Sequence, residues 1–308
     1  MAERVEILMA VYNGAQYLPE QLDSILAQTD GDWHLTVSDD FSDDGSAEII
    51  GDYARRFPDK IAFCHPPRRF GGARDHFFWL MGRCDAGTML FCDQDDAWYP
   101  DKVRRMREAM ARAVAEFGAD TPILVFSDQV PTDAGLKPLA PSLMRYQQQY
   151  FERFDYRSLL MQNVVTGGAM GVNRALARLG APAGDARGII MHDWWLAVVA
   201  ARFGKIVYLD EPLGVYRQHG ENAVGAKDVR SAGYVARKLS TLRKVRGTIL
   251  KKKAQATAFR TVYADRLAPE DEAFLTAFER PRSGVGFWLK YRRLIHGAFR
   301  RAGMLLLC

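Results

Sequence analysis

Three aspartates in the segment 89–102, MLFCDQDDAWYPDK, have types and a spacing that could do chemistry. Asp93, Asp95 and Asp96 follow an apolar run at 88–92 that predicts a buried strand. In an extended segment side chains at i and i+2 point the same way, so we expect Asp93 and Asp95 on one side and Asp96 on the other. Packed carboxylates repel, and a bound cation relieves the repulsion. All-oxygen ligands suit Mg²⁺ or Mn²⁺, ions that hold substrate phosphates. The pattern predicts a metal site for a phosphorylated ligand, with a plain acidic turn as the alternative.

Apolar runs and helical spacings along the chain predict the elements that position these aspartates. Strands are expected at Val5–Val11, 34–38, 61–64, 88–92, 123–126 and 206–209, and helices at 17–28, 46–57, 73–83, 100–117 and 193–202. Pro100 is expected in the first turn of its helix. The alternation of strands and helices predicts an α/β layer fold with a largely parallel sheet.

Polar turns follow three of these strands, at 12–14, 38–40 and 93–96. Ligands of such sheets bind beyond the carboxyl ends of the strands. The three turns should therefore converge on one crevice, which favours the metal site over the plain turn. Residues 131–163 predict a loop-rich insertion that shapes an acceptor pocket, and TGGAMG at 166–171 predicts a flexible or close-approach segment before a short helix.

Length and composition limit the classes of protein to which the chain can belong. The chain has 308 residues, of which 48% are hydrophobic and 26% are charged. This length and composition predict a globular protein of one or two domains. No apolar run reaches the length of a membrane span, and no signal peptide is visible. The four cysteines have neither metal-type nor disulfide-type spacing, which fits a reducing cytosol.

The net charge of +5 is unevenly distributed. Residues 230–308 hold 18 Lys and Arg against 5 Asp and Glu, whereas residues 1–229 hold 24 against 32. We therefore expect two parts, a domain at 1–225 that carries the candidate metal site, here called the catalytic domain, and a basic helical region at 226–308. Its apolar stripes are Val235, Leu239, Leu242, Val245 and Ile249, and then Trp288, Tyr291, Ile295, Ala298 and Ala302. Such helices contact an anionic membrane surface or pack on the catalytic domain.

Two common nucleotide motifs are absent. No Gly-x-Gly-x-x-Gly follows the first strand and no Walker phosphate loop occurs, which argues against a nicotinamide dehydrogenase and a P-loop ATPase. Instead the second strand ends in carboxylates, which accept hydrogen bonds from sugar hydroxyls or base N–H groups.

Five motifs in order carry a family resemblance over about residues 5–220: MAVYNG at 9–14, VSDDFSDDG at 37–45, GGAR at 71–74, DQDD at 93–96 and HDWW at 192–195. The chain resembles family 2 glycosyltransferases of the GT-A fold. With YRQHG at 216–220 it is most similar to the rhamnosyltransferase-like branch, which builds bacterial surface polysaccharides. Phe41 departs from the glycine usual in the family's Asp-Asp-Gly-Ser turn.

The resemblance implies a set of donor-binding residues. Tyr12 would stack on the nucleotide base, Asp39 and Asp40 would hold base and ribose, and Arg74 and Arg217 would reach the diphosphate. The remaining nucleotide-sugar contacts implied are Ala10, Asp93, Gln94 and Gly168. Tyr12 as a packing residue, Asp39 and Asp40 as turn caps, and Arg74 paired with Asp75 are the structural alternatives.

The resemblance also implies the metal and acceptor residues. Asp93 and Asp95 would hold Mg²⁺ or Mn²⁺, with His219 as a third ligand and Asp96 in support. Asp193 would be the general base that deprotonates the acceptor hydroxyl, so that one displacement inverts the anomeric configuration. His192, Trp194 and Trp195 would contact the acceptor, although one of the two tryptophans is expected to face the core. Asp193 as a mere helix-start residue is the alternative.

The functional hypothesis is an inverting, metal-dependent glycosyltransferase that uses a nucleoside diphospho-sugar, with dTDP-L-rhamnose as the suggested donor. Its acceptor would be a surface-polysaccharide or lipid-linked glycan, and the protein would be cytoplasmic and peripheral at the inner face of the bacterial membrane. A nucleotidyltransferase is the enzymatic alternative, but residues 1–20 offer only Arg4 for the basic phosphate loop that it needs. A nucleic-acid-binding module that uses the tail is the other alternative. The acidic body argues against it, so nucleic acid is not an expected partner.

Overall fold

The computed structural model of the chain describes residues 4–149, 154–182, 187–220, 242–280 and 284–294. The chain divides into two compact units. The first comprises Met1–Leu143, Val165–Ala181 and Met191–Ala226, and the second comprises Met144–Val164, Pro182–Ile190 and Lys227–Cys308. The expected boundary at 225/226 lies outside the described residues and stays a prediction. The second unit also takes two segments that the sequence did not assign to it.

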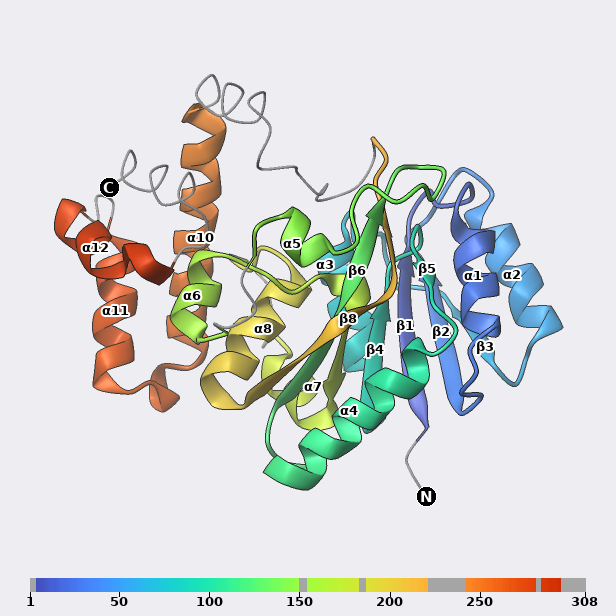
Figure 1. Cartoon of the computed structure of the whole chain (residues 1–308), viewed down its shortest axis with the longest axis horizontal. Helices are drawn as coiled ribbons and strands as arrows, with labels where there is room; N and C mark the ends of the chain where they lie inside the picture. Colours follow the sequence, from blue (N-terminus) through green and yellow to red (C-terminus); the bar gives the residue numbers. More distant parts are fainter. Residues whose placement is uncertain (1–3, 150–153, 183–186, 221–241, 281–283, 295–308) are drawn as a thin grey trace. The chain divides into compact units, whose positions relative to one another are not determined.

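An eight-stranded sheet in the order β3-β2-β1-β4-β7-β6-β8-β5 forms the centre of the first unit. The strands are β1 (Val5–Val11), β2 (Trp33–Asp39), β3 (Ile61–Cys64), β4 (Thr88–Cys92), β5 (Ala97–Trp98), β6 (Ile123–Thr132), β7 (Met170–Asn173) and β8 (Lys205–Arg217) (Figure 1). Pairing is parallel from β3 to β4 through β2 and β1, and again between β6 and β8. The predicted α/β fold with a largely parallel sheet is confirmed.

Two short strands were not predicted. β7 lies between β4 and β6 and is antiparallel to both, and β5 is antiparallel to β8. In addition, β6 and β8 extend well beyond the predicted ranges, to Thr132 and Arg217. The last two residues of β6, Pro131 and Thr132, therefore lie where the predicted loop-rich insertion was expected to begin.

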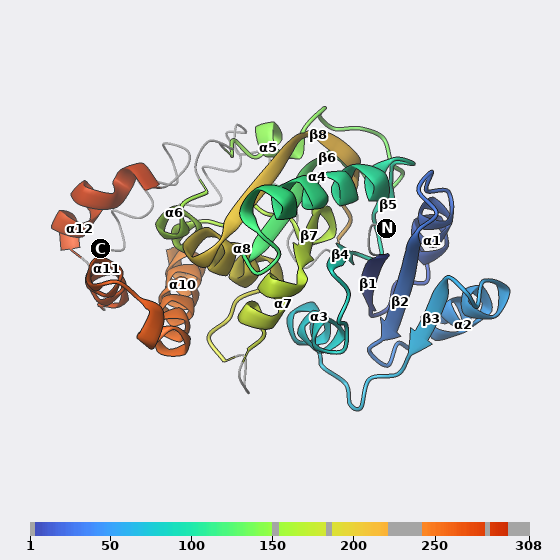
Figure 2. The same ribbon diagram turned by 90° about the horizontal axis from the view of Figure 1, so that it is seen from below.

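Helices cover both faces of the sheet. They are α1 (Leu18–Leu26), α2 (Ser46–Arg56), α3 (Ala73–Gly82), α4 (Lys102–Phe117), α7 (Arg174–Gly180) and α8 (His192–Phe203). Figure 2 shows α4 on one side of the sheet and α3 and α7 on the other. Pro100 precedes its helix rather than standing in the first turn, because α4 begins at Lys102 with Asp101 as its N-cap.

Alternating strand residues build the core on the α1, α2 and α4 face. Ile7, Met9 and Val11 of β1 are buried in one cluster with apolar residues of these helices, such as Leu22 and Met106. The opposite face carries Phe91 of β4, whose ring lies 5.6 Å from that of Phe77 in α3. Burial on both faces explains why β4 reads as a continuous apolar run.

The second unit is helical, with α6 (Tyr156–Met161), α10 (Leu242–Val262), α11 (Pro269–Glu279) and α12 (Gly284–Tyr291). Another short helix, α5 (Leu143–Tyr146), spans the junction of the units. Tyr156 donates its hydroxyl proton to buried Asp271 and its ring lies 6.2 Å from that of Phe259 in α10. These contacts join α6, α10 and α11 within the second unit.

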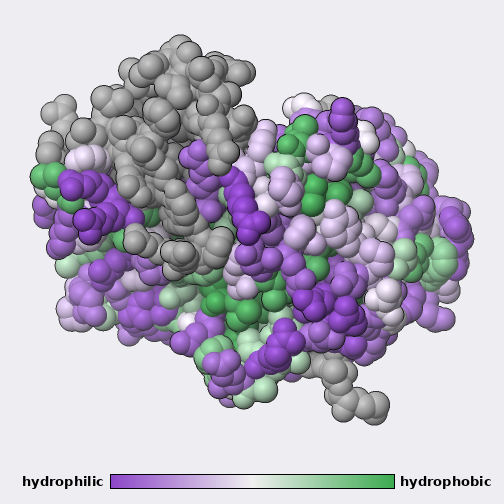
Figure 3. All heavy atoms as spheres, viewed as in Figure 1, coloured by the Kyte–Doolittle hydropathy of each residue, from purple (hydrophilic) through white to green (hydrophobic). Residues whose placement is uncertain are grey.

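Most residues of the two apolar stripes predicted in the basic region have no described side chain. Ile249 is half-buried, and Tyr291 packs its ring 5.0 Å from that of Phe274. Lys252 and Lys253 of α10 donate to the carbonyls of Met161 and Arg280, so part of the basic charge is engaged within the unit. On the face in Figure 3 the described side chains are mostly hydrophilic, with smaller hydrophobic areas between them. Among the described residues no helix is both long and apolar enough to span a membrane.

The end of α8 makes a close contact that can be tested. A Cβ atom at Gly204 would lie 1.8 Å from the carbonyl oxygen of Pro122, which also accepts the Lys205 N–H. Gly204→Ala should therefore destabilise the protein by about 3 kcal/mol or more, measured by urea unfolding, because backbone atoms must shift. Gly82→Ala is the matched control, since nothing lies within 4 Å of its added methyl. Equal stability of the two variants would contradict this packing.

Candidate active site

Residues 93–96, here called the acidic turn, leave the strand directly after β4. Because they form a turn and not an extended segment, the expected separation of Asp96 from Asp93 is wrong. A Cβ atom at Gly168 would lie 2.8 Å from Asp96 Oδ2 and 2.9 Å from Asp93 Oδ2, so these two carboxylates converge on one backbone position. Asp95 points elsewhere, to His219.

Gly167 and Gly168, here called the glycine pair, join two groups of predicted site residues. The Gly168 N–H donates to Asp93 Oδ2 at 3.1 Å. A Cβ atom at Gly167 would lie 3.3 Å from His192 Nε2 and 3.8 Å from Asp193 Cβ. The close approach predicted for 166–171 is confirmed: the backbone of the glycine pair lies close to carboxylates and to the buried ring of His192.

Electrostatic shifts indicate that the acidic groups share one environment. Burial, followed by the charges of Asp95 and Asp193, raises the pKa of Asp93. Burial, followed by the charges of Asp95 and Asp93, raises the pKa of Asp96 well above its usual range. The pKa of Tyr216 is raised by burial and then by these neighbouring carboxylates, Asp193 included. The acidic turn and Asp193 therefore lie close enough for their charges to interact.

A buried lysine, Lys102, was missed in the sequence. It is 1% exposed, donates from Nζ to the Gly168 carbonyl at 2.7 Å and lies 4.2 Å above the Trp98 ring. Burial lowers its pKa, while the neighbouring Asp96 and Asp93 oppose the shift. Helical spacing could have revealed it, because Lys102 lies one turn before the buried Met106 of α4. Lys102 holds the glycine pair against the acidic turn and places a cation there.

The end of β8 holds the acidic turn from the other side. Arg217, predicted to reach the diphosphate, is 3% exposed, and its three guanidinium nitrogens already donate to the Asp95 carbonyl, the Ala134 carbonyl and Glu20. Its backbone N–H donates to Asp96 Oδ1 at 3.2 Å. We therefore correct its role from phosphate contact to positioning of the turn. Gln129 of β6, also missed, donates to Asp96 Oδ2 at 2.9 Å.

The acidic turn offers the carboxylate ligands that a hard divalent cation prefers. Burial, and then the charge of Asp95, raises the pKa of Asp93 and of Asp96, and a bound cation would oppose these shifts. His219, the predicted third ligand, contacts Asp95 Oδ2 through Nε2 at 2.6 Å. Within the described part of the chain, no three His, Cys, Asp or Glu side chains are grouped closely enough to hold a metal ion. The metal site therefore stays a prediction, with Asp93, Asp95 and His219 as the residues expected to hold it.

Asp193 lies in the first turn of α8, is 8% exposed, and accepts the Trp194 N–H on Oδ1 at 2.6 Å. The Cβ atom of Asp193 lies beside the glycine pair, and its carboxylate is held by the adjacent backbone N–H. Trp194 is half-buried and keeps its place as an acceptor candidate. Trp195 is fully buried and donates Nε1–H to the Gly180 carbonyl at 3.0 Å, so it is a core residue and not an acceptor contact.

His192 is packed, contrary to its predicted acceptor contact. Its ring lies 4.3 Å from that of Phe77 and 5.2 Å from that of Phe91, and it is 3% exposed. Within the described residues neither ring nitrogen has a hydrogen-bond partner. Burial therefore lowers the pKa of His192 to about 3.

Asp39 is the last residue of β2 and Asp40 follows it, and both carboxylates have backbone partners. Asp39 accepts the Ser42 N–H at 2.9 Å, and Asp40 accepts the N–H groups of Phe70 and Gly71 at 2.6 and 2.8 Å. The turn-capping alternative is thus present in the structure, and Asp40 also anchors the loop before α3. The remaining oxygen lone pairs are compatible with the predicted nucleoside contacts.

The turn after β1 is tied to the acidic turn through one amide. The Gln94 side chain accepts the Tyr12 N–H at 2.8 Å and donates to the Tyr12 carbonyl at 2.9 Å. Tyr12 is 44% exposed, and the Arg69 guanidinium, not predicted, lies 4.7 Å above its ring. Ala10 lies one residue before the end of β1, paired with Ser38. Gln94 thus holds the backbone under an exposed ring.

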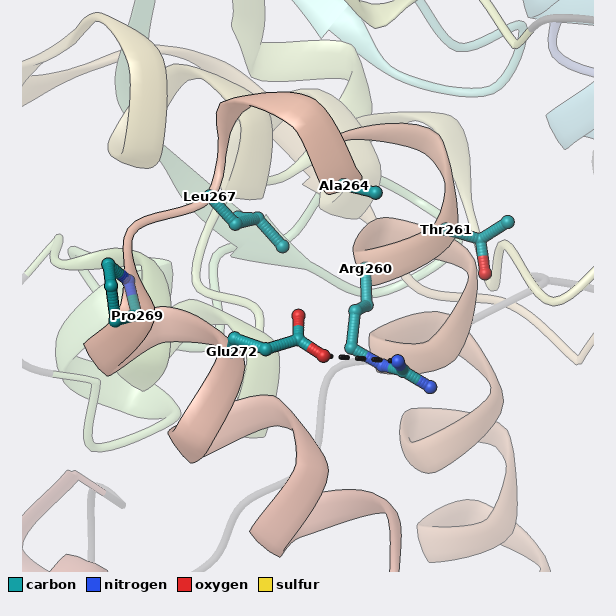
Figure 4. Close-up of a pocket in the computed structure, with 6 residues that line it drawn as sticks. All are labelled: Arg260, Thr261, Ala264, Leu267, Pro269 and Glu272. Carbon is teal, nitrogen blue, oxygen red and sulfur yellow. Dashed lines mark hydrogen bonds and ion pairs between the residues drawn. The ribbon is translucent and has the colours of Figure 1, made fainter.

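Arg74, predicted to reach a diphosphate, is paired with Asp75 at 2.7 Å, which was the structural alternative. A pocket of about 480 Å³ lies elsewhere, in the second unit. It contains none of the predicted site residues. Figure 4 shows Arg260 and Glu272 pointing toward each other in it, at 3.1 Å.

Comparison with known sequences gives a family and relatives. A sequence model of the family described as Glycosyl transferase family 2 matches residues 6–179. The dTDP-rhamnosyl transferase RfbG of Shigella flexneri is 28% identical over 240 residues, which cover 73% of this chain and 76% of that protein. An uncharacterised glycosyltransferase of Nostoc is 27% identical over 229 residues, covering 71% of this chain and 66% of that protein.

Comparison with solved structures supports the fold. S. aureus TarS 1–349 in complex with UDP-GlcNAc superposes with a TM-score of 0.57 at 13% identity, covering 99% of this chain and 90% of that one. The mannosyltransferase PcManGT from Pyrobaculum calidifontis, in complex with GDP-Man and Mn²⁺, gives a TM-score of 0.51 at 16% identity, with 99% and 87% covered. At these identities the likeness shows the GT-A fold alone.

The unpartnered His192 ring predicts a pH-dependent stability. Its pKa is about 3 when folded and ~6.5 when unfolded, so below pH 6.5 the unfolded chain takes up a proton that the folded protein rejects. Folding stability is therefore lost as the pH falls. Between pH 7.5 and 5.0 the native protein should lose about 2 kcal/mol more than His192→Leu, measured by urea unfolding at both pH values. Leu196→Ala, in the same helix, should lower stability equally at both. An identical pH dependence in the native protein and His192→Leu would disprove the buried neutral ring.

Proposed function

Because the chain belongs to glycosyl transferase family 2, we propose that it is an inverting, metal-dependent enzyme that transfers a sugar from a nucleoside diphospho-sugar to a glycan hydroxyl. The observation that carries the proposal is the glycine pair, which brings the acidic turn and Asp193 to one place at the carboxyl edge of the sheet. A transferase needs such a meeting point, because the leaving diphosphate and the attacking hydroxyl flank one anomeric carbon.

The donor would lie across the ends of β1, β2 and β4. Tyr12 would contact the base, and Asp39 and Asp40 would contact the nucleoside, beside the turns that they already stabilise. Asp93 and Asp95 would hold Mg²⁺ or Mn²⁺, which supplies positive charge for the leaving diphosphate. Lys102, buried beside Asp93, adds a fixed cation to the same region.

The acceptor hydroxyl would be deprotonated by Asp193. Its carboxylate is held by the Trp194 N–H, and its charge contributes, after burial and the charge of Asp95, to the raised pKa of Asp93. Transfer of the hydroxyl proton to Asp193, as that oxygen forms the new bond and the diphosphate departs, balances the step and inverts the anomeric centre. Trp194, half-buried beside it, would contact the acceptor sugar.

The donor and acceptor are proposed from similarity. The relative from Shigella flexneri is a dTDP-rhamnosyl transferase, which supports dTDP-L-rhamnose as the donor. A bacterial surface or lipid-linked glycan would then be the acceptor, at the inner membrane face, with the basic region of residues 226–308 contacting anionic lipid. Family membership disfavours the nucleotidyltransferase and nucleic-acid-binding alternatives.

Asp193→Asn should retain donor binding and lose transfer. Removing the base typically lowers the rate by about 10²–10⁴-fold while the donor contacts stay intact. Donor affinity is measured by calorimetry with dTDP-L-rhamnose and Mn²⁺, and transfer by release of dTDP in the presence of acceptor glycan. Asp52→Asn, an exposed aspartate of α2, is the control and should keep full activity. Full transfer by Asp193→Asn would refute its role as base.

The metal requirement is tested separately. EDTA and the Asp95→Ala substitution should each reduce dTDP release by at least about 10²-fold, because the leaving diphosphate loses its compensating charge. Added Mn²⁺ should restore the EDTA-treated native enzyme but not Asp95→Ala. Undiminished release in EDTA would eliminate the metal from the proposal.

A further inference from the structure

Phe41 has an unusual backbone conformation beside the proposed nucleoside site. Its φ is +61°, in the left-handed region that bulky side chains rarely adopt. Its side chain is 56% exposed, so packing does not offset the strain. A single exposed apolar residue is ordinary, but one held in a strained conformation at a proposed site calls for a physical reason.

The turn that carries Phe41 is held rigidly by its neighbours. The Ser42 N–H donates to Asp39 at 2.9 Å, and Ser42 Oγ accepts the Asn13 N–H at 2.8 Å. The Asp43 N–H donates to Asn13 Oδ1 at 3.1 Å. Asn13 itself has a φ of +48°, so two strained turns face and stabilise each other.

Both turns present an aromatic ring. Val11 pairs with Asp39 in the sheet, and the Asp40 N–H donates to the Val11 carbonyl at 2.8 Å. Tyr12 follows Val11 and Phe41 follows Asp40, two residues that are joined by this hydrogen bond. The Tyr12 side chain is 44% exposed and that of Phe41 is 56% exposed. The guanidinium of Arg69 lies over the Tyr12 ring and donates to its hydroxyl.

We infer that Phe41 is a donor-contacting residue that offers its ring to the nucleobase of the nucleoside diphospho-sugar, beside Tyr12. The inference rests on the proposed function. A rigid exposed aromatic face suits a flat, weakly hydrated ring, and every base has such a face. Phe41 therefore sets affinity for the nucleoside and does not select among bases. The diphosphate and the sugar lie outside its contact.

One substitution at Phe41 separates nucleotide binding from backbone strain, because relief of the strain should raise stability whereas loss of the ring should lower affinity. Asparagine tolerates a positive φ, so Phe41→Asn should raise Tm by about 2 °C. The same substitution should weaken the binding of dTDP and of UDP, each with Mn²⁺, by about tenfold, and leave the binding of inorganic pyrophosphate with Mn²⁺ unchanged. Phe41→Tyr should keep the native affinity for both nucleotides. In turnover assays Phe41→Asn should raise the donor KM and leave kcat nearly unchanged.

Leu136→Asn is the matched strain control. Leu136 also has a positive φ, +62°, in the turn after β6. It should gain a similar Tm increase and keep native dTDP affinity. A lower Tm for Phe41→Asn, or native dTDP affinity in that variant, would overturn the inference while the native protein still binds dTDP. If the native protein binds neither dTDP nor UDP with Mn²⁺, the proposed function and this inference fall together.

Discussion

The approach of the Gly168 backbone to two buried carboxylates is the constraint on which the proposed site depends. Asp93 and Asp96 would repel each other if both were charged, and their burial raises the cost. The Gly168 N–H, the Gln129 amide and the Lys102 ammonium lie around them and reduce that cost. A side chain on Gly168 would displace both carboxylates, so glycine is required there by contact.

The topology of the sheet is what places Gly168 against these two carboxylates. The short antiparallel strand β7 lies between β4 and β6 and is what brings the glycine pair to the end of β4. The long strand β8 then returns alongside β6 and ends at Arg217, whose guanidinium binds the Asp95 carbonyl. Both segments serve to hold the acidic turn in place. The second half of the sheet is therefore a support for residues that come from the first half.

The sequence predicts the first half of the fold well, because local patterns determine it. The apolar runs of β1 and β4 and the helical spacing of α4 are visible without tertiary contacts. The strand β7 is not visible, since four residues that include a glycine carry no periodicity. The role of Arg217 was mistaken for a similar reason: a guanidinium suits a phosphate and a backbone carbonyl equally, and only the fold shows which is near. His192 is buried because of how α8 packs, which its neighbours in sequence do not reveal; the tryptophan expected to face the core is Trp195.

Residues whose backbone conformation or crowding is unusual for their type lie at the same edge of the sheet. Asn13 and Phe41 have positive φ values in the turns after β1 and β2, and Gly168 meets two carboxylates at the end of β4. The Gln94 amide ties the first of these turns to the acidic turn. Strained or crowded residues persist only where the surrounding structure determines them, and such places are concentrated at functional sites. The three turns are fixed to one another before any donor arrives, so binding would not have to order them.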